Sequence, residues 1–228
     1  MKKLVFMLAV ALAFSTTAMA IDIGCSTHAN WWGEADATTV MNNIAANVPV
    51  SMEIFSSTEE DALADWVVAH TGNGQSDLLI LTGFVPTTIY TGGNADPDGS
   101  IAELFLDDGN CIINTGDWFW YVSSPNNAGD GLANLMDFPG ISMSDPIVAV
   151  TPTADGTLYT PSFAGFSPSR PWHLDQFDGT EWQPELIMGV NDDGTRADPA
   201  IIINTVTGAR VGTFFQVAGA MVDEKSAV

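Results

Sequence analysis

Hydrophobic positions in the first two-thirds of the chain fall into two alternating patterns. Short apolar runs, typical of β-strands, occupy residues 21–25, 48–55, 77–83 and 110–116. The run at 77–83 is continuously apolar at its centre, as expected of a parallel strand covered on both faces. Between the runs, apolar residues recur at helical spacing, as Val40, Met41 and Ile44 illustrate. Strands that alternate with helices predict a parallel sheet joined by right-handed crossovers.

Local signals mark further helices in this part of the chain. In a capping box, a Ser side chain accepts a backbone N–H and a Glu three residues later reaches back. The sequence has this pattern at residues 57–60 and 100–103. A short helix is expected around residues 132–136, and a strand at 146–150.

The pattern changes after Thr151, where turn-forming residues separate short strand-like runs. The turns are expected at residues 155–156, 178–179 and 192–194. Residues 200–204 and 210–217 are expected to form a closing antiparallel pair, joined by a turn at Thr207-Gly208. We therefore predict an α/β fold: a three-layer sandwich with a mostly parallel, flavodoxin-like sheet extended by antiparallel edge strands. Residues 21–228 are expected to form this single domain.

The first twenty residues have the pattern of a secretory signal peptide. Lys2 and Lys3 precede an apolar run at 4–14, and Ala18-Met19-Ala20 has the form of a cleavage site. The apolar run is shorter than the roughly 20 residues that span a bilayer. We expect cleavage after Ala20 and a secreted or periplasmic protein that has no membrane contact after cleavage.

The charge of the chain limits the partners that it can have. Its 28 acidic residues outnumber six Lys and Arg, and the formal net charge is −22. Such a surface repels phosphate backbones, so nucleic acid is not an expected partner. The acidity is compatible with salt-rich surroundings or divalent cations, but solubility alone is sufficient to explain it.

Cys25 and Cys111 are the two cysteines of the chain. Cys25 falls near the end of one predicted parallel strand and Cys111 at the start of another. Parallel strands would then separate them by roughly 10 Å along the strand direction, whereas a disulfide needs Cα atoms within about 7 Å. We predict two unpaired, mostly buried cysteines.

Candidate binding residues lie in loops at the carboxyl ends of the predicted parallel strands, where open α/β sheets bind ligands. The loops at 26–33, 82–90 and 115–121 contain aromatic and polar residues. Exposed aromatic rings beside hydrogen-bonding groups suit sugar rings, although the same aromatics could be core residues that cover the sheet end. The candidate ligand-binding residues are His28, Trp31, Trp32, Gly83, Thr115, Gly116, Trp118 and Trp120.

Several segments together resemble the ThuA-like (trehalose-utilisation) family of the class I glutamine amidotransferase-like superfamily. They are the strand, loop and helix from Ile21, the strand at 78–83, and the string at 110–117. The stretch at 212–216 is similar to that family's closing strand. The resemblance implies a ligand of carbohydrate type.

The resemblance also implies where an amidotransferase nucleophile would be. The matching turn at 115–118 has no Cys, and Cys111 lies at the wrong end of the strand, so glutamine hydrolysis is not expected. Asp117 could replace the nucleophile, with His173 and Asp175 spaced as a base and its orienting carboxylate. The alternative interpretation is that Asp117 is a turn residue or helix cap and His173 a packed or surface histidine.

One loop has the alternating oxygen ligands of a calcium site. Asn94, Asp96 and Asp98 precede Gly99, but Phe105 stands where an EF-hand has its closing Glu. Calcium is therefore a candidate here, and no other cofactor is expected.

Three functions are compatible with the sequence. The first is a secreted domain that binds, or also processes, a small-molecule or carbohydrate ligand. The second is a non-catalytic protein-interaction module on the same scaffold. The third is a hydrolase that depends on Asp117, His173 and Asp175.

Overall fold

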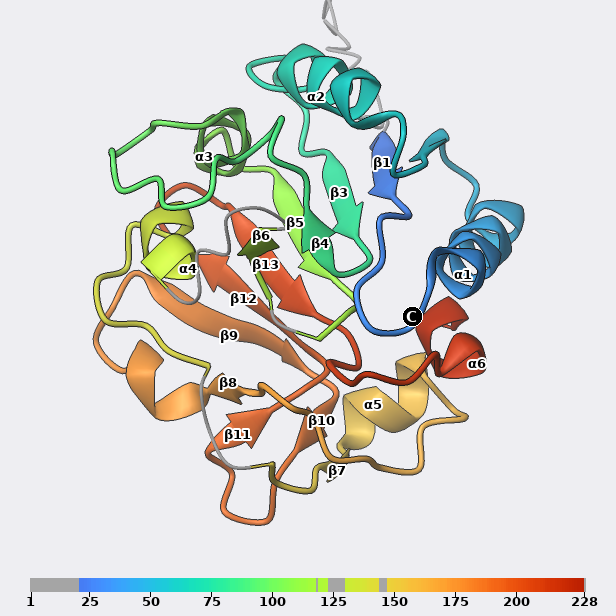
Figure 1. Cartoon of the computed structure of the whole chain (residues 1–228). Coiled ribbons are helices and arrows are strands. Elements are labelled where there is room, and N and C mark those ends of the chain that lie inside the picture. Colours follow the sequence, from blue (N-terminus) through green and yellow to red (C-terminus); the bar gives the residue numbers. More distant parts are fainter. Residues whose placement is uncertain (1–20, 118, 123–129, 144–146, 228) are drawn as a thin grey trace, which may run out of the picture.

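The main sheet is mixed, with mostly parallel strands, in the computed structural model, which describes residues 21–117, 119–122, 130–143 and 147–227. Its seven strands lie in the order β2 (Met52–Phe55), β1 (Ile23–Ser26), β3 (Leu78–Leu81), β5 (Cys111–Asn114), β13 (Arg210–Thr213), β12 (Ala200–Asn204) and β9 (Trp182–Ile187). The first five are parallel, β12 is antiparallel to β13, and β9 is antiparallel to β12. The α/β class and the mostly parallel sheet agree with the prediction (Figure 1).

Each predicted run in the parallel part overlaps one strand of four residues, and β1 extends one residue beyond its run, to Ser26. Polar side chains bind backbone N–H groups at the N-terminal ends of the parallel strands. The Asp77 side chain accepts the Asp22 N–H (2.9 Å), and the Asn110 side chain accepts the Asp77 N–H (2.7 Å). These two bonds link the residues that directly precede three adjacent strands, β1, β3 and β5.

The positions of two predicted strands were wrong. The strand expected at 146–150 begins only at β7 (Thr151–Pro152), and Val150 makes an isolated bridge to Phe166. The run at 210–217 ends as a strand at Thr213, because Phe215 takes a left-handed backbone conformation (φ 57°). The pair of β12 and β13 is confirmed, but β13 lies inside the sheet, beside β5.

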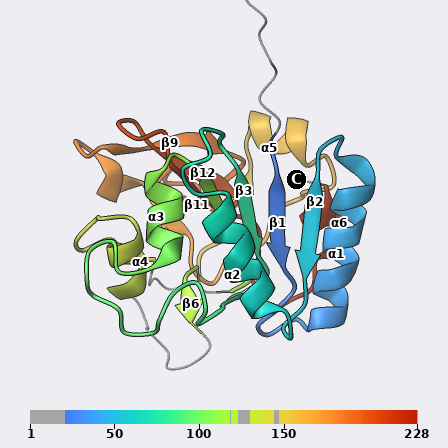
Figure 2. The ribbon, with the colours of Figure 1, turned by 90° about the horizontal axis from the view of Figure 1, so that it is seen from above.

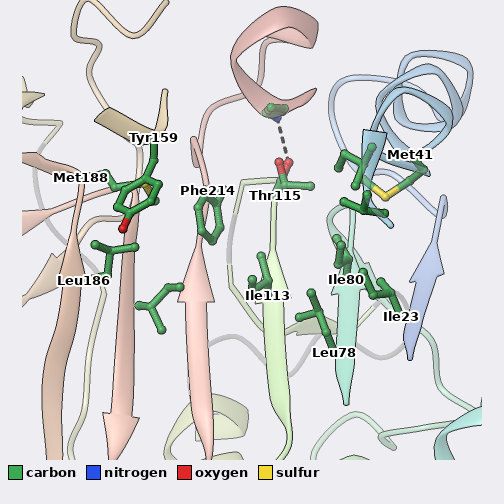
Figure 3. A pocket seen from close by; sticks show the side chains of 14 residues that line it. Ile23, Met41, Leu78, Ile80, Ile113, Thr115, Tyr159, Leu186, Met188 and Phe214 are labelled. Carbon is green, nitrogen blue, oxygen red and sulfur yellow. Dashed lines mark hydrogen bonds between the residues drawn. The ribbon is translucent and has the colours of Figure 1, made fainter. Parts of the chain in front are cut away.

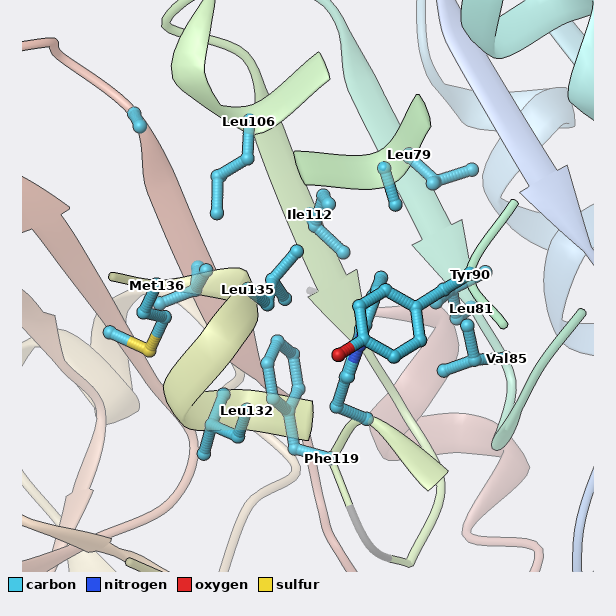
Figure 4. Packing of buried hydrophobic residues seen from close by; sticks show 14 of the residues in the cluster. Leu79, Leu81, Val85, Tyr90, Leu106, Ile112, Phe119, Leu132, Leu135 and Met136 are labelled. Atoms are coloured by element: carbon cyan, nitrogen blue, oxygen red, sulfur yellow. The ribbon is translucent and has the colours of Figure 1, made fainter. Parts of the chain in front are cut away.

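Helices pack on both faces of the parallel strands (Figure 2). α1 (Glu34–Asn47) packs Val40 and Met41 against Ile80 of β3. α2 (Glu60–Ala69), α3 (Ile101–Asp107) and α4 (Asp130–Leu135) lie on the other face. They pack against Leu79, whose side chain points away from that of Ile80 because successive strand residues alternate between faces. Figure 4 shows this larger cluster, with Leu106, Leu135 and Phe119 around Ile112.

A second, antiparallel sheet was not predicted. It contains β7, β10 (Gly189–Val190), β11 (Arg196–Ala197) and β8 (Trp172–His173). β4 (Phe84–Val85) and β6 (Tyr121–Val122) form a separate parallel pair. The 3₁₀ helix η1 (Leu174–Phe177) follows β8.

The turns of the C-terminal third agree with the prediction at 178–179 and 192–194 and differ at 155–156. The turn at 192–194 joins β10 to β11, where Gly194 N–H donates to the Asn191 carbonyl. The turn expected at 155–156 is instead part of α5 (Ala154–Tyr159). Thr153 starts this helix by accepting the Gly156 N–H at its hydroxyl (3.1 Å).

One of the two predicted capping boxes is correct. Ser100 accepts the Glu103 N–H at the start of α3. The box at 57–60 is wrong, because Ser57 donates to Glu34 instead and no side chain caps α2. The Glu59 carboxylate accepts from the preceding Ser56, one residue earlier than predicted.

Both cysteines are free, as predicted. Cys25 lies opposite Ile80, and Cys111 opposite Leu78, so that β3 separates them. Cys25 is buried and Cys111 is half-buried, and burial raises the pKa of the Cys111 thiol to about 12.

The predicted signal peptide, residues 1–20, lies outside the described residues. No helix among residues 21–227 that the structure describes is long and apolar enough to cross a membrane.

Candidate functional site

The loops after β1, β3 and β5 meet at the carboxyl edge of the sheet. Ala29 forms an isolated bridge with Gly83, and the Asn30 amide donates to the Asp117 carbonyl (2.6 Å). The Trp32 indole N–H donates to the Thr82 carbonyl (2.7 Å). Parallel strands bring these loops together, as the sequence predicted, because their carboxyl ends share one edge.

Gly83 and Gly116 are required by the close approach of Asn30. A Cβ atom on Gly116 would lie 2.7 Å from Asn30 Oδ1, and one on Gly83 would lie 2.6 Å from the Asn30 nitrogen. Gly83 also has a φ of 141°, which few residues other than glycine adopt. The two glycines predicted to bind ligand therefore hold the loops together around Asn30.

The tryptophans differ sharply in exposure. Trp31 is 60% exposed, whereas Trp32 and Trp120 are 6% and 2% exposed. The Trp120 ring packs edge-on against Tyr90, with centroids 5.2 Å apart. Trp118 lies outside the described residues. Burial corrects the prediction that Trp32 and Trp120 form a binding platform, because neither ring offers a face to a ligand.

Trp31 has an unusual backbone conformation. Its φ is 58°, and the Trp32 N–H donates across it to the Asn30 carbonyl (2.6 Å). Three-residue turns with a positive φ are rare and strained. This turn sends the Trp31 side chain outward and the Trp32 side chain inward.

His28, in the same loop, is held by a glutamate that the sequence analysis had assigned to helix capping. His28 Nδ1 lies 2.6 Å from Glu60 Oε1, and both side chains are about one-quarter exposed. The His28 ring also packs against Phe84, with centroids 5.0 Å apart. The arrangement fixes the imidazole and leaves Nε2 without a hydrogen bond among the described residues.

Glu34 ties this part of the site to the next loop. Its carboxylate accepts from the Ser57 N–H (2.8 Å), the Ser57 hydroxyl (2.9 Å) and the Thr27 hydroxyl (3.2 Å). These hydrogen bonds, the backbone bond from Ser57 first, lower the pKa of Glu34. Glu34 therefore stays ionised and links Thr27, the residue before His28, to Ser57 of the loop before α2.

The residues proposed as catalytic occupy two different settings. Asp117 Oδ1 lies 3.9 Å from Arg170 Nε at the carboxyl edge. Asp175 Oδ1 pairs with Arg196 Nη1 at 2.9 Å, and His173 is buried in β8. An Asp175 carboxylate that binds Arg196 is poorly placed to orient His173, so the spacing of His173 and Asp175 in sequence is not by itself a catalytic pair.

A buried polar network that the sequence did not suggest contacts the loop that carries Asp117. Asp198 is fully buried and accepts from the Thr213 hydroxyl (2.8 Å) and the Gln216 N–H (2.7 Å). Gln216 Oε1 in turn accepts the Phe119 N–H (2.9 Å). Burial raises the pKa of Asp198 to about 7, against these hydrogen bonds. The network joins β13 to the loop after β5.

The predicted calcium loop is organised differently from a metal site. Asn94 Oδ1 accepts the Asp96 N–H (3.1 Å), and the Asn94 amide donates to Glu103 (2.8 Å). Asp98 instead lies with Asp107 and Asp137, whose carboxylate oxygens are within 4.8 Å of one another on the surface. Three exposed carboxylates at this spacing could hold a divalent cation.

The outcome for the individual site residues is therefore mixed. The structure brings together the loops that carry His28, Trp31, Gly83, Gly116 and Asp117. Sequence reasoning missed the roles of Glu60, Asp107 and Asp137, because their partners are distant along the chain.

No protein-family model matches the chain, and no curated protein matches it.

Proposed function

We propose that this chain is a secreted ThuA-like domain that binds a carbohydrate-type ligand at the loops after β1 and β3. The observation that carries the proposal is Trp31, a ring that is 60% exposed on a backbone with a φ of 58°. Strained conformations persist where the surrounding structure enforces them, and they cluster at binding and catalytic sites. An exposed indole face is also the group on which a sugar ring stacks.

His28 and Glu60 supply the polar half of such a site. Sugar hydroxyls both donate and accept hydrogen bonds, so they need an acceptor and a donor beside the aromatic face. The Glu60 carboxylate accepts, and His28 donates or accepts at Nε2 according to its protonation state. His28 is three residues from Trp31 in the same loop.

The topology supports the family and the finer fold class. The first four parallel strands, numbered along the chain, lie in the order second, first, third and fourth, as in flavodoxin-like sheets. The strand order reverses between β1 and β3, which is where such sheets bind ligands. With helices on both faces, we propose a three-layer sandwich, in a chain whose first twenty residues are removed on export.

His28 and Glu60 also favour a second candidate function, hydrolysis. A carboxylate at Nδ1 orients an imidazole and stabilises its protonated form, so that Nε2 can act as a general base. In this reading His28 activates water, and the base is not His173. Hydrolysis requires the same ligand to bind first, so binding is the primary proposal.

Isothermal titration calorimetry with a panel of oligosaccharides tests the binding proposal. Trp31→Ala should abolish binding of any sugar that the unaltered protein binds. Val206→Ala, a change at another exposed apolar residue (69% exposed), should leave affinity unchanged. Failure of every sugar to bind, or equal affinity in Trp31→Ala, would refute the proposal.

Product analysis of the bound sugar separates binding from hydrolysis. His28→Ala should abolish turnover, whereas Asp175→Asn should retain it, if His28 is the base. Binding without any product in the unaltered protein would favour a non-catalytic binding domain.

A further inference from the structure

An apolar groove crosses the sheet face on which α1 lies (Figure 3). Its volume is about 280 Å³, near the lower end of the roughly 300–1,000 Å³ found for small-molecule sites. Met41 of α1 borders it on one side and Tyr159 of α5 on the other. The floor consists of side chains from four strands and from the residue that follows β13: Ile80, Ile113, Ile201, Leu186 and Phe214.

The groove exists because the helices on this face lie at its borders. Ile113 and Ile201 are only partly buried although they belong to inner strands, and Leu186 of the edge strand β9 is partly buried as well. Gly212 of β13 lies between Ile113 and Ile201 in the pairing register and has no side chain. Partly buried aliphatic side chains in a concave site are the lining that apolar ligands use.

The groove has a polar site between its two borders, at the carboxyl edge of the sheet (Figure 3). Lys225 of α6 (Val222–Ser226) lines it and is 3% exposed. Its Nζ donates to the Thr115 carbonyl (2.8 Å) and lies 3.9 Å from the centroid of the Trp32 ring. The Thr115 hydroxyl also belongs to a lining residue, is buried, and has no hydrogen-bond partner among the described residues.

The charge of Lys225 is only partly compensated. Burial lowers the pKa of Lys225 to about 7, while Asp198 and Asp117 act in the opposite direction. Among Lys and Arg residues of the described chain, Lys225 is the most deeply buried. A buried ammonium group and an unpartnered buried hydroxyl beside an apolar groove match one anionic, oxygen-containing head group.

We propose that this groove binds a medium-chain carboxylate, with its head group at Lys225 and Thr115 and its hydrocarbon chain along the groove. Both polar groups can donate to carboxylate oxygens. Thr115 directly follows β5, and Leu186 lies in β9, three inter-strand spacings away. They amount to about 14 Å, the reach of an extended chain of about ten carbons. The site is separate from the sugar site proposed at Trp31.

Calorimetry with decanoate, kept below its micelle concentration, tests the proposal directly. Decanoate should bind at least about tenfold more tightly than decyltrimethylammonium, which has the same chain and the opposite charge. Lys225→Met should lose this preference and retain binding of decanol. The bound carboxylate favours the charged lysine, so Lys225 should take up a proton when decanoate binds near pH 8. Titrations in buffers of different ionisation enthalpy measure this proton uptake.

A second variant keeps the proposal falsifiable if Lys225→Met does not fold. Ile201→Trp fills the groove and should weaken decanoate and decanol alike. Val206→Trp adds the same ring at an exposed residue outside the groove lining and should weaken neither. No decanoate binding, equal binding of the cationic amphiphile, or unchanged affinity in Ile201→Trp would overturn the proposal. Self-association of the unaltered protein that Ile201→Trp abolishes would assign the groove to a second copy instead.

Discussion

Asn30 occupies the space that a side chain on Gly83 would need. A Cβ atom at Gly83 would lie 2.6 Å from the Asn30 nitrogen, and the φ of Gly83 is 141°. Gly83→Ala should therefore lower the free energy of unfolding by about 2–4 kcal/mol, from the clash and the strained backbone together. Chemical denaturation measures this difference.

Gly194→Ala is the matched control. Gly194 has a φ of 72°, but nothing lies within 4 Å of its ideal Cβ position. The substitution should cost only the backbone term, about 1–2 kcal/mol. Equal losses in the two variants would show that the contact between Asn30 and Gly83 does not constrain the loops.

Trp31→Asn should separate the role of the Trp31 ring from that of its backbone. Asn tolerates a left-handed conformation better than Trp, and the ring is mostly exposed. We expect a free energy of unfolding within about 1 kcal/mol of the unaltered protein, together with loss of sugar binding. A loss of several kcal/mol in thermal or chemical unfolding would instead assign the ring a structural role.

The sheet was predictable because a strand buried on both faces must be apolar. The run at 77–83 contains β3, and its position fixed where the loops at Gly83 and Thr115 would meet. The exposure of adjacent aromatics was not predictable in this way. Trp31 and Trp32 are chemically alike, and a single turn with a positive φ decides which of them faces solvent.

The groups that sequence reasoning missed are those whose partners lie far along the chain. Glu60 had a sufficient local explanation as a capping residue, yet it binds His28. Asp107 and Asp137 come together only when α3 packs near α4. Local periodicity carries no information about such pairs, because it reports which face is buried and not which side chains meet.

Asp107→Asn should stabilise the protein at neutral pH. Desolvation and the neighbouring acids, Asp98 and Asp137, raise the pKa of Asp107 to about 7. The folded state then binds a proton that the unfolded state releases near pH 4, so this contribution to stability falls as pH rises from about 4 to 7. The variant should gain up to about 1 kcal/mol on the unaltered protein at pH 7–8, the scale of exposed charge interactions.

Denaturation of both proteins from pH 4 to pH 8 measures the difference. The advantage of Asp107→Asn should vanish toward pH 4. Asp193→Asn, at an exposed residue outside the cluster, controls for the change in net charge. An equal gain in Asp193→Asn would attribute the effect to the overall charge of −22 and not to the cluster.

The contribution of Lys225 to stability should depend on pH above pH 7, and it should rise with pH, whereas that of Asp107 falls. The pKa of Lys225 is about 7 in the folded protein and near 10.5 when the chain is unfolded. Between these values the unfolded state holds a proton that the folded state has released, so the unaltered protein gains stability as pH rises. The gain relative to Lys225→Met should approach, and not exceed, about 1.4 kcal/mol per pH unit between pH 7 and pH 10.

Urea denaturation of the two proteins at matched pH gives the difference, and Asp223→Asn on the same helix should show no such slope. A flat difference for Lys225→Met would mean that Lys225 titrates alike in both states and that its ammonium group is not held in an apolar site.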